Sequence, residues 1–269
     1  LLVFVIVLSH FYKRLNTQAF SHHAGKDFRL GELTVSSPFV ALYKRELARF
    51  FSCTIYVLNS CIVIILLLVI SIMAVFYMPD VIIQQLETIG IMDIFEAVIP
   101  LIISVFVCMC CTTSASLSLE GRSRWIMYSA PVKTITVFKA KIFVNLTVVL
   151  PILWISLILL RITFPLTMVQ TILLFVTPTI YALFISAVGM LFNVKYPRFD
   201  WTSEYYAIKG GAISVLATIG VGLALSAIPV YFCVLSREYA QQIVIAMTVV
   251  IAVLALIAYR MLSKIRLYM

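Results

Sequence analysis

Charge is scarce in this sequence. Only 12% of the 269 residues are Asp, Glu, Lys or Arg, whereas 63% are hydrophobic. Soluble domains average about 25% charged and about 45–50% apolar residues, so the composition excludes an ordinary soluble protein. The charges are also clustered, and the apolar stretches between them reach the roughly 20 residues that one spanning helix needs. The composition therefore predicts an all-α integral membrane protein with several spans.

Residues that catalysis would need are scarce as well. The only histidines are His10, His22 and His23, and the sequence contains neither an H-E-x-x-H motif nor the phosphate-binding pattern G-x-x-x-x-G-K-[ST]. An ion-coupled carrier normally needs an ionisable side chain within the membrane, and the nearest candidate, Glu96, lies at the end of its apolar stretch. These absences argue against an intramembrane enzyme, a channel and a secondary carrier. We expect no catalytic residue on this chain.

The 6 cysteines do not indicate a disulfide framework. All of them fall inside or at the ends of apolar stretches, where cysteine behaves as a small buried hydrophobe. Cys108 and Cys111 have a C-x-x-C spacing that a soft metal could use, but no histidine or carboxylate lies near them in the sequence. We therefore interpret the cysteines as packing residues and expect no metal: Cys53, Cys61, Cys108, Cys110, Cys111 and Cys233.

Seven apolar stretches can be drawn, of which the first is partial and ends near Tyr12. Residues 1–35 are then the end of a preceding span and a cytoplasmic linker, and residues 36–269 form one six-span domain. The very short connectors near 160–166 and 236–241 predict antiparallel helical hairpins. The complete spans are predicted at Cys53–Met78, Ile94–Leu117, Val137–Leu160, Leu166–Asn193, Gly211–Leu235 and Gln242–Leu262.

Few polar residues and several prolines fall within these spans. Asn59, Asn145 and Gln170 are the main polar side chains at depth, and amides of this kind usually join helices. Proline inside a helix removes a backbone hydrogen bond and can kink it. The prolines expected within spans are Pro100, Pro151, Pro178 and Pro229.

The basic residues give the orientation. If residues 13–51 lie in the cytoplasm and the spans alternate from there, all of the 20 Lys and Arg residues except Arg161 and Arg237 are cytoplasmic. This is the bias that the positive-inside rule describes. The net charge of +9 is thus an orientation signal, and we expect no nucleic-acid partner.

Residues 36–51, "SSPFVALYKRELARFF", predict a helix that lies in the lipid headgroup layer before the first complete span. Ser37 is a good N-cap and Pro38 a good first helical residue. Arg45 and Arg49 are expected behind a wide apolar face, and the alternative is a plain extension of the next span. That apolar face consists of Phe39, Val40, Tyr43, Leu47, Phe50 and Phe51.

The connector 118–133, "SLEGRSRWIMYSAPVK", predicts a short helix over 119–130 that Pro131 ends. On this helix Leu119, Ile126 and Ala130 form an aliphatic stripe, and Trp125 and Tyr128 project from nearly the opposite side. Glu120 and Arg124 have the spacing of an i,i+4 ion pair. A second apolar-aromatic face suits a docked partner. Anchoring of the helix pair by Trp125 at the headgroups fits the composition equally well.

The connector 193–211, "NVKYPRFDWTSEYYAIKGG", brings further aromatic and charged residues to the same side. Asp200 or Thr202 could cap a short helix leading to Lys209, and Gly210-Gly211 would break it. Anchoring by Trp201, Tyr205 and Tyr206 is again the alternative. Together the two connectors favour a docked partner modestly.

At these residues the sequence resembles permease subunits of bacterial ATP-binding-cassette transporters of the exporter type. It is particularly similar to the large two-half permeases of Gram-positive bacteria, of which it resembles the C-terminal half. "SLEGRSRWIMYSAPV" resembles the Glu-Gly-basic-x-x-Trp…Ser-x-Pro connector of that family, with Lys139 or Lys141 starting the next span. "YPRFDWTSE…IK" and "PFVALYKRELARFF" resemble its second cytoplasmic motif and its amphipathic elbow helix. The similarity extends over nearly all of residues 36–269.

The resemblance implies a six-helix bundle with an elbow helix and a cytoplasmic coupling helix that contacts a separate ATPase subunit. ATP and Mg²⁺ are then expected on that subunit, and no cofactor on this chain. By resemblance the coupling helix contributes Glu120, Gly121, Arg122, Arg124, Trp125, Tyr128 and Pro131. The second contact comprises Arg198, Asp200, Trp201 and Glu204, and the elbow contributes Phe39, Tyr43, Leu47 and Phe50. The sequence departs from the family pattern at Ala130, where a bulky aliphatic residue is expected.

The function implied is ATP-driven export across the bacterial cytoplasmic membrane, together with a second transmembrane half. The mostly apolar spans favour an amphipathic, lipid-like or peptide substrate over a small ion. A non-transporting scaffold, a sensor or immunity subunit, and a channel or secondary carrier remain alternatives that the sequence leaves open.

Overall fold

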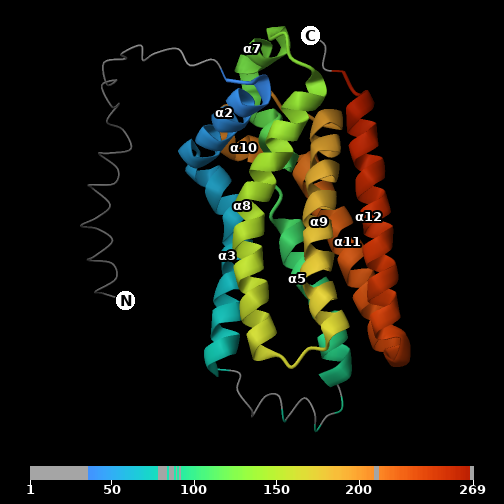
Figure 1. Cartoon of the computed structure of the whole chain (residues 1–269). Coiled ribbons are helices and arrows are strands. Elements are labelled where there is room, and N and C mark those ends of the chain that lie inside the picture. Colours follow the sequence, from blue (N-terminus) through green and yellow to red (C-terminus); the bar gives the residue numbers. More distant parts are fainter. Residues whose placement is uncertain are drawn as a thin grey trace, which may run out of the picture. The chain divides into compact units, whose positions relative to one another are not determined.

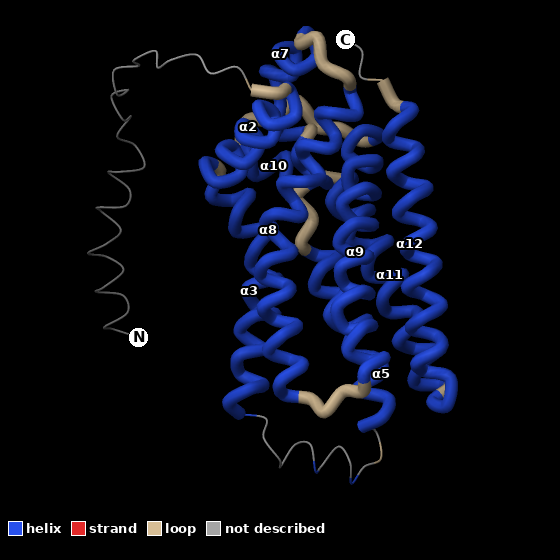
Figure 2. Tube along the Cα trace, in the orientation of Figure 1, coloured by secondary structure: helices blue, strands red, loops and turns tan. Residues whose placement is uncertain are grey.

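The computed structural model describes residues 36–77, 84, 88, 90, 92–208 and 212–266. The partial span and linker expected within residues 1–35 lie outside the described residues. In the described part every regular element is a helix (Figures 1 and 2). Six helical segments are long and apolar enough to cross a membrane, which confirms the predicted number of complete spans.

The spanning helices are α3 (Thr54–Tyr77), α5 (Met92–Met109), α8 (Thr134–Thr163), α9 (Met168–Lys195), α11 (Ile213–Leu235) and α12 (Ala240–Lys264). The shorter elements are α2 (Pro38–Ser52), α6 (Thr113–Ser116), α7 (Arg124–Ser129), α10 (Glu204–Ile208) and the 3₁₀ helices η1 (Ser118–Ser123) and η2 (Arg237–Tyr239). Helix α9 packs against α5, α8, α11 and α12, so the hydrophobic core lies along it.

The bundle has two different ends. Helices α2, α7 and α10 lie toward one end, together with the last turn of α12, and we call this the connector end (Figure 1). The tight turns from α8 to α9 and from α11 to α12 lie at the opposite end, as the predicted antiparallel hairpins require. The connectors that the sequence assigned to one side of the membrane therefore share one end of the molecule.

Helix α2 is a separate helix and not an extension of the next span. Ser37 caps it, and it ends at Ser52 because Cys53 has an extended backbone (φ −102°, ψ 97°). The apolar side chains of its predicted face are not equally covered: Phe50 is buried against the ring of Tyr56, whereas Phe51 is exposed. Arg49 also turns inward, toward the buried Glu46.

The second span, predicted over Ile94–Leu117, is found, but it is broken into two helical pieces. Helix α5 ends at Met109, and the chain becomes helical again in α6. The backbone groups that the break frees are bonded: the Thr112 N–H donates to Asn145 Oδ1 (2.8 Å), and the Thr112 carbonyl accepts from Tyr56 Oη (2.7 Å). Such partners are what make non-helical backbone tolerable at membrane depth.

A glycine allows the broken segment to approach α9 closely. A Cβ at Gly189 would lie 2.5 Å from Cys111 Sγ and 2.8 Å from Thr113 Oγ1, so no larger residue fits without a shift. Small residues bring spanning helices together in this way. Cys108 and Cys110 are buried in apolar clusters nearby, in agreement with the interpretation that these cysteines serve packing.

The polar residues expected at depth behave differently from one another. Asn145 is fully buried and also donates to Ser186 Oγ (2.7 Å), so it joins helices as predicted. Gln170 does not lie at depth. It forms a capping box with Thr167 at the start of α9, and its amide donates to Glu96 Oε2 (3.2 Å). The four prolines lie inside α5, α8, α9 and α11, and each of these helices continues through its proline.

Candidate functional site

Helix α7 forms the tip of the connector end (Figure 1). Its inner side is fixed, because Met127 is buried in a cluster with Leu117 and Val137. Its outer side is open: Trp125 is 58% exposed and Ile126 is 52% exposed. The helix therefore presents an aromatic and an aliphatic side chain beside each other, away from the bundle.

The helix predicted over 119–130 is wrong, because the chain kinks at Gly121. The backbone there has φ 51° and ψ −132°, which separates η1 from α7. Positive φ is strained for residues with a side chain. There is also no room, since a Cβ on Gly121 would lie 2.9 Å from the Trp201 ring. The kink also explains why Leu119 is buried and Ile126 exposed, where the sequence predicted a shared stripe.

Trp201 holds the second connector against the first. Its indole N–H donates to the Ser118 carbonyl (2.8 Å), and the Ser118 hydroxyl accepts from the Arg198 N–H (3.0 Å). The Ser118 N–H donates to the buried Asn193 Oδ1 (3.0 Å). Trp201 is thus half-buried inside the connector layer, whereas Asp200 and Glu204, grouped with it in the sequence, are exposed.

Substitution of Gly121 by Ala is expected to lower the free energy of unfolding by about 1–3 kcal/mol, from backbone strain and the forced shift of Trp201. Gly220→Ala is the matched control, because a Cβ at Gly220 has no neighbour within 4 Å and Ala favours the helix. Thermal unfolding in detergent should show a lower midpoint for Gly121→Ala only. Equal midpoints for the two variants would contradict the close contact with Trp201.

A largely buried ionic cluster joins η1, which directly precedes α7, to its neighbours. Glu120, whose side chain is 1% exposed, pairs with Lys141 Nζ (2.9 Å), Arg45 Nη2 (2.5 Å) and Arg49 Nη1 (2.9 Å). Glu46 pairs with the same Lys141 (2.8 Å) and with Arg49 (2.5 Å). We call these five residues the ionic cluster. It ties η1 to α2 and α8.

The cluster carries three cations and two carboxylates. Burial by itself lowers the pKa of Arg49, but the carboxylates of Glu46 and Glu120 more than offset this, and its pKa lies above the ordinary value. Arg49 and Lys141 also donate to the Ser116 carbonyl, both at 3.1 Å. A displacement of η1 would therefore be transmitted to α2 and α8 through short, charge-assisted contacts.

Two features of this cluster escaped the sequence analysis. The i,i+4 pair of Glu120 with Arg124 was wrong: Glu120 turns inward, and Arg124 lies over the Phe199 ring, 4.2 Å from its centroid. Glu46 was not singled out at all. The only signal for it was a lone carboxylate in a basic helix, three residues before Arg49.

The other predicted site residues divide between the interior and the surface. Of the connector residues, Glu120 and Gly121 are buried, Arg124 and Tyr128 are half-buried, and Arg122 and Pro131 are exposed.

The predicted elbow residues pack on the bundle itself. Phe39 makes an edge contact with Phe143 (5.4 Å between centroids), and Tyr43 Oη donates to Thr147 Oγ1 (3.0 Å). Leu47 and Phe50 join an apolar cluster. The exposed large apolar side chains of α2 are Val40 and Phe51 instead.

No protein-family model, curated protein or solved structure matches this chain. Among the described residues, no group of His, Cys, Asp and Glu side chains is arranged to hold a metal ion. The site is therefore characterised by its geometry alone. It consists of the exposed apolar side chains of α7 and the neighbouring ionic cluster.

Proposed function

We propose that this chain is the membrane permease subunit of an ATP-driven exporter of the ATP-binding-cassette type, and that α7 docks on a separate ATPase subunit. The observation that carries the proposal is the exposed Trp125 and Ile126 pair on a helix that buried contacts hold in place. Trp is enriched at the centres of protein interfaces, and a preorganised helix loses little freedom on binding. Exposed Arg122 adds a charged group at the rim.

The ionic cluster supplies a route for mechanical coupling. When the ATPase subunits close on ATP, α7 moves with them, and η1 moves with α7. The cluster passes this displacement to α2 and α8, while the break between α5 and α6 lets the second span bend. Rigid elements that rearrange around a discrete hinge are a common basis for switching between two conformations. The sequence has no phosphate-binding loop, so the proposal assigns ATP and Mg²⁺ to the partner.

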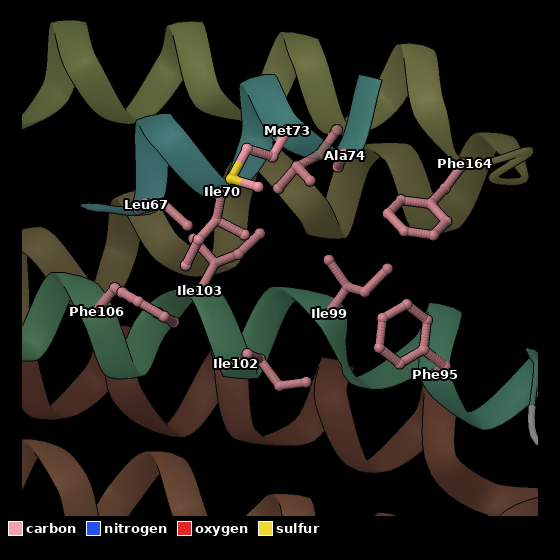
Figure 3. A pocket seen from close by; sticks show the side chains of 11 residues that line it. Leu67, Ile70, Met73, Ala74, Phe95, Ile99, Ile102, Ile103, Phe106 and Phe164 are labelled. Carbon is pink, nitrogen blue, oxygen red and sulfur yellow. The ribbon is translucent and has the colours of Figure 1, made fainter. Parts of the chain in front are cut away.

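An amphipathic or lipid-like substrate suits the interior best. A cavity of about 490 Å³ lies between α3, α5 and the end of α8, and its lining residues are all apolar. Figure 3 shows Ile99 and Ile103 of α5 on the side that faces α3, with Ile103 beside Ile70 and Phe164 at one end. A small ion would find no polar group there, whereas a hydrocarbon chain would fit.

The proposal includes a second transmembrane half and a location in the bacterial cytoplasmic membrane. A pathway for an amphipathic substrate can form between two such bundles. The connector end faces the cytoplasm in this account, because the positive-inside bias and the ATPase both require it.

The experiment that tests the proposal is purification of the tagged chain from its native membrane in mild detergent, followed by reconstitution in liposomes. An ATPase with a phosphate-binding loop should co-purify, and an amphipathic solute should stimulate its hydrolysis. Co-purification without stimulation by any solute would favour a scaffold or sensor. If no ATPase co-purifies with the chain, the proposal is contradicted.

Cysteine labelling tests the orientation separately. The native cysteines in the described part of the chain are all buried, so their background labelling should be low. We expect Ser123→Cys and Ser203→Cys, both exposed at the connector end, to resist a membrane-impermeant maleimide in intact cells. Gln84→Cys, on the opposite side of the first complete span, should react. The reverse pattern would invert the topology.

A further inference from the structure

A groove in the connector-end half of the bundle differs from the cavity between α3 and α5. It has a volume of about 610 Å³ and lies between α9, α11 and α12. Lys195 is the only charged lining residue, and the others are apolar. The groove is thus apolar along its length and carries the positive charge of Lys195 at one end.

The groove is as long as one leaflet of a bilayer. Its lining on α9 runs from Phe184 to Lys195, and its lining on α12 from Leu254 to Ile265. At a rise of about 1.5 Å per residue, each wall is about 16 Å long. Half of the roughly 30 Å hydrocarbon core is about 15 Å. A groove of this length is long enough to extend from the bilayer centre to the headgroup level at the connector end.

The groove is open to the surroundings of the bundle, because Ile257 and Met261 on its rim are exposed. Ordered water is not stabilised in an apolar space, because it finds no hydrogen-bond partners there. In a membrane, the molecules that meet this opening are lipids. A hydrocarbon chain is thus the occupant that the body of the groove suits.

The mouth of the groove carries positive charge. Lys195 is exposed at the end of α9, and its Nζ lies over the Tyr196 ring (5.3 Å to the centroid). Lys264 is exposed at the end of α12 and directly precedes Ile265, the last lining residue. Basic residues placed at the headgroup level between spanning helices attract anionic lipid headgroups.

We propose that an anionic glycerophospholipid of the connector-end leaflet binds in this groove. One acyl chain lies between α9, α11 and α12, and the phosphate headgroup sits at Lys195 and Lys264. The residues that line the cavity between α3 and α5 include no charged side chain, whereas Lys195 lines this groove. The site does not depend on transport or on an ATPase, so it stands or falls separately from the proposed function.

Native mass spectrometry of the purified, delipidated chain tests the site, with titration of phosphatidylglycerol and of phosphatidylcholine with the same acyl chains. We expect phosphatidylglycerol to bind more tightly. In the double variant Lys195→Ala/Lys264→Ala this preference should fall by about tenfold or more. The matched control is Lys44→Ala/Lys133→Ala, which removes two exposed cations elsewhere at the connector end and should keep the preference.

A second pair of variants tests the body of the groove. Val221→Phe on α11 and Ile257→Phe on the exposed rim add bulk inside it, and both should weaken the binding of phosphatidylglycerol in the folded protein. Two results would overturn the proposal: equal affinity for the two lipids in the native sequence, or unchanged phosphatidylglycerol binding in both Phe variants. Cross-links from Ile257 to a second permease half, with no lipid retained, would assign the groove to a protein interface instead.

Discussion

Replacement of Glu120 by Gln is expected to lower the free energy of unfolding by about 3 kcal/mol or more, as loss of one partner from a buried ion cluster generally does. The substitution keeps the shape of the side chain but removes its charge. Arg49 and the fully buried Lys141 would then share only the carboxylate of Glu46, and Arg45 would lose its ion pair. Lys141 has no access to solvent that could compensate the lost negative charge.

Lys141→Met should cost less than Glu120→Gln. Without Lys141 the two carboxylates still have two guanidinium groups, so the remaining charges balance. Glu238→Gln, at an exposed carboxylate near the opposite end, is the control and should leave stability unchanged. Thermal unfolding of the four proteins in one detergent gives the comparison. Similar midpoints for Glu120→Gln and Glu238→Gln would show that the ionic cluster does not stabilise the bundle.

The sequence could not have revealed this cluster. Arg45 lies 75 residues from Glu120, and Lys141 lies 95 residues from Glu46. Local spacing offers only the neighbouring partner Arg124, and that pair did not form. Whether a charged side chain is buried depends on which helices pack against each other. The periodicity of a sequence describes only the faces of a single helix, so it does not predict such packing.

The number of spans, by contrast, was predictable from length and hydrophobicity, because a bilayer imposes both on each helix. The same measures missed the break after Met109, since Cys110, Cys111 and Thr112 continue an apolar run. What stabilises the break are distant groups, Tyr56 and Asn145. The kink at Gly121 was missed for a similar reason, because Trp201 lies in another connector.

The exposed tip was predicted in part. Trp125 is exposed, and Ile126, which was predicted on an aliphatic stripe nearly opposite Trp125, is exposed as well. Helix α7 has only 6 residues, so the spacing of its apolar residues does not define which face is buried. Its orientation follows from the Gly121 kink and from Met127, which anchors the inner side.

Trp125→Ala is expected to weaken binding of the ATPase subunit by about 2 kcal/mol or more, which is about thirtyfold in affinity. The indole is the largest exposed side chain on α7, and its removal takes away the centre of the proposed contact. The bundle should stay folded, because the buried contacts of Met127 and Glu120 do not involve Trp125. Binding of the purified ATPase to the chain in nanodiscs is the measurement.

Trp154→Ala provides the matched control for this variant. Trp154 is exposed to a similar extent (48%) but lies within the spanning helix α8. Its removal should leave ATPase affinity per folded molecule unchanged. If Trp125→Ala lowers stability and leaves that affinity intact, Trp125 anchors the connector in the headgroup layer instead.

The most direct test of the docking site is photo-activated cross-linking from position 126 in native membranes. Ile126 is exposed beside Trp125, so a photoreactive residue there should remain on the surface of the tip. Our account predicts one dominant protein adduct, with an ATPase that carries a phosphate-binding loop, and no such adduct from position 154. Adducts with lipid alone from position 126 would contradict it.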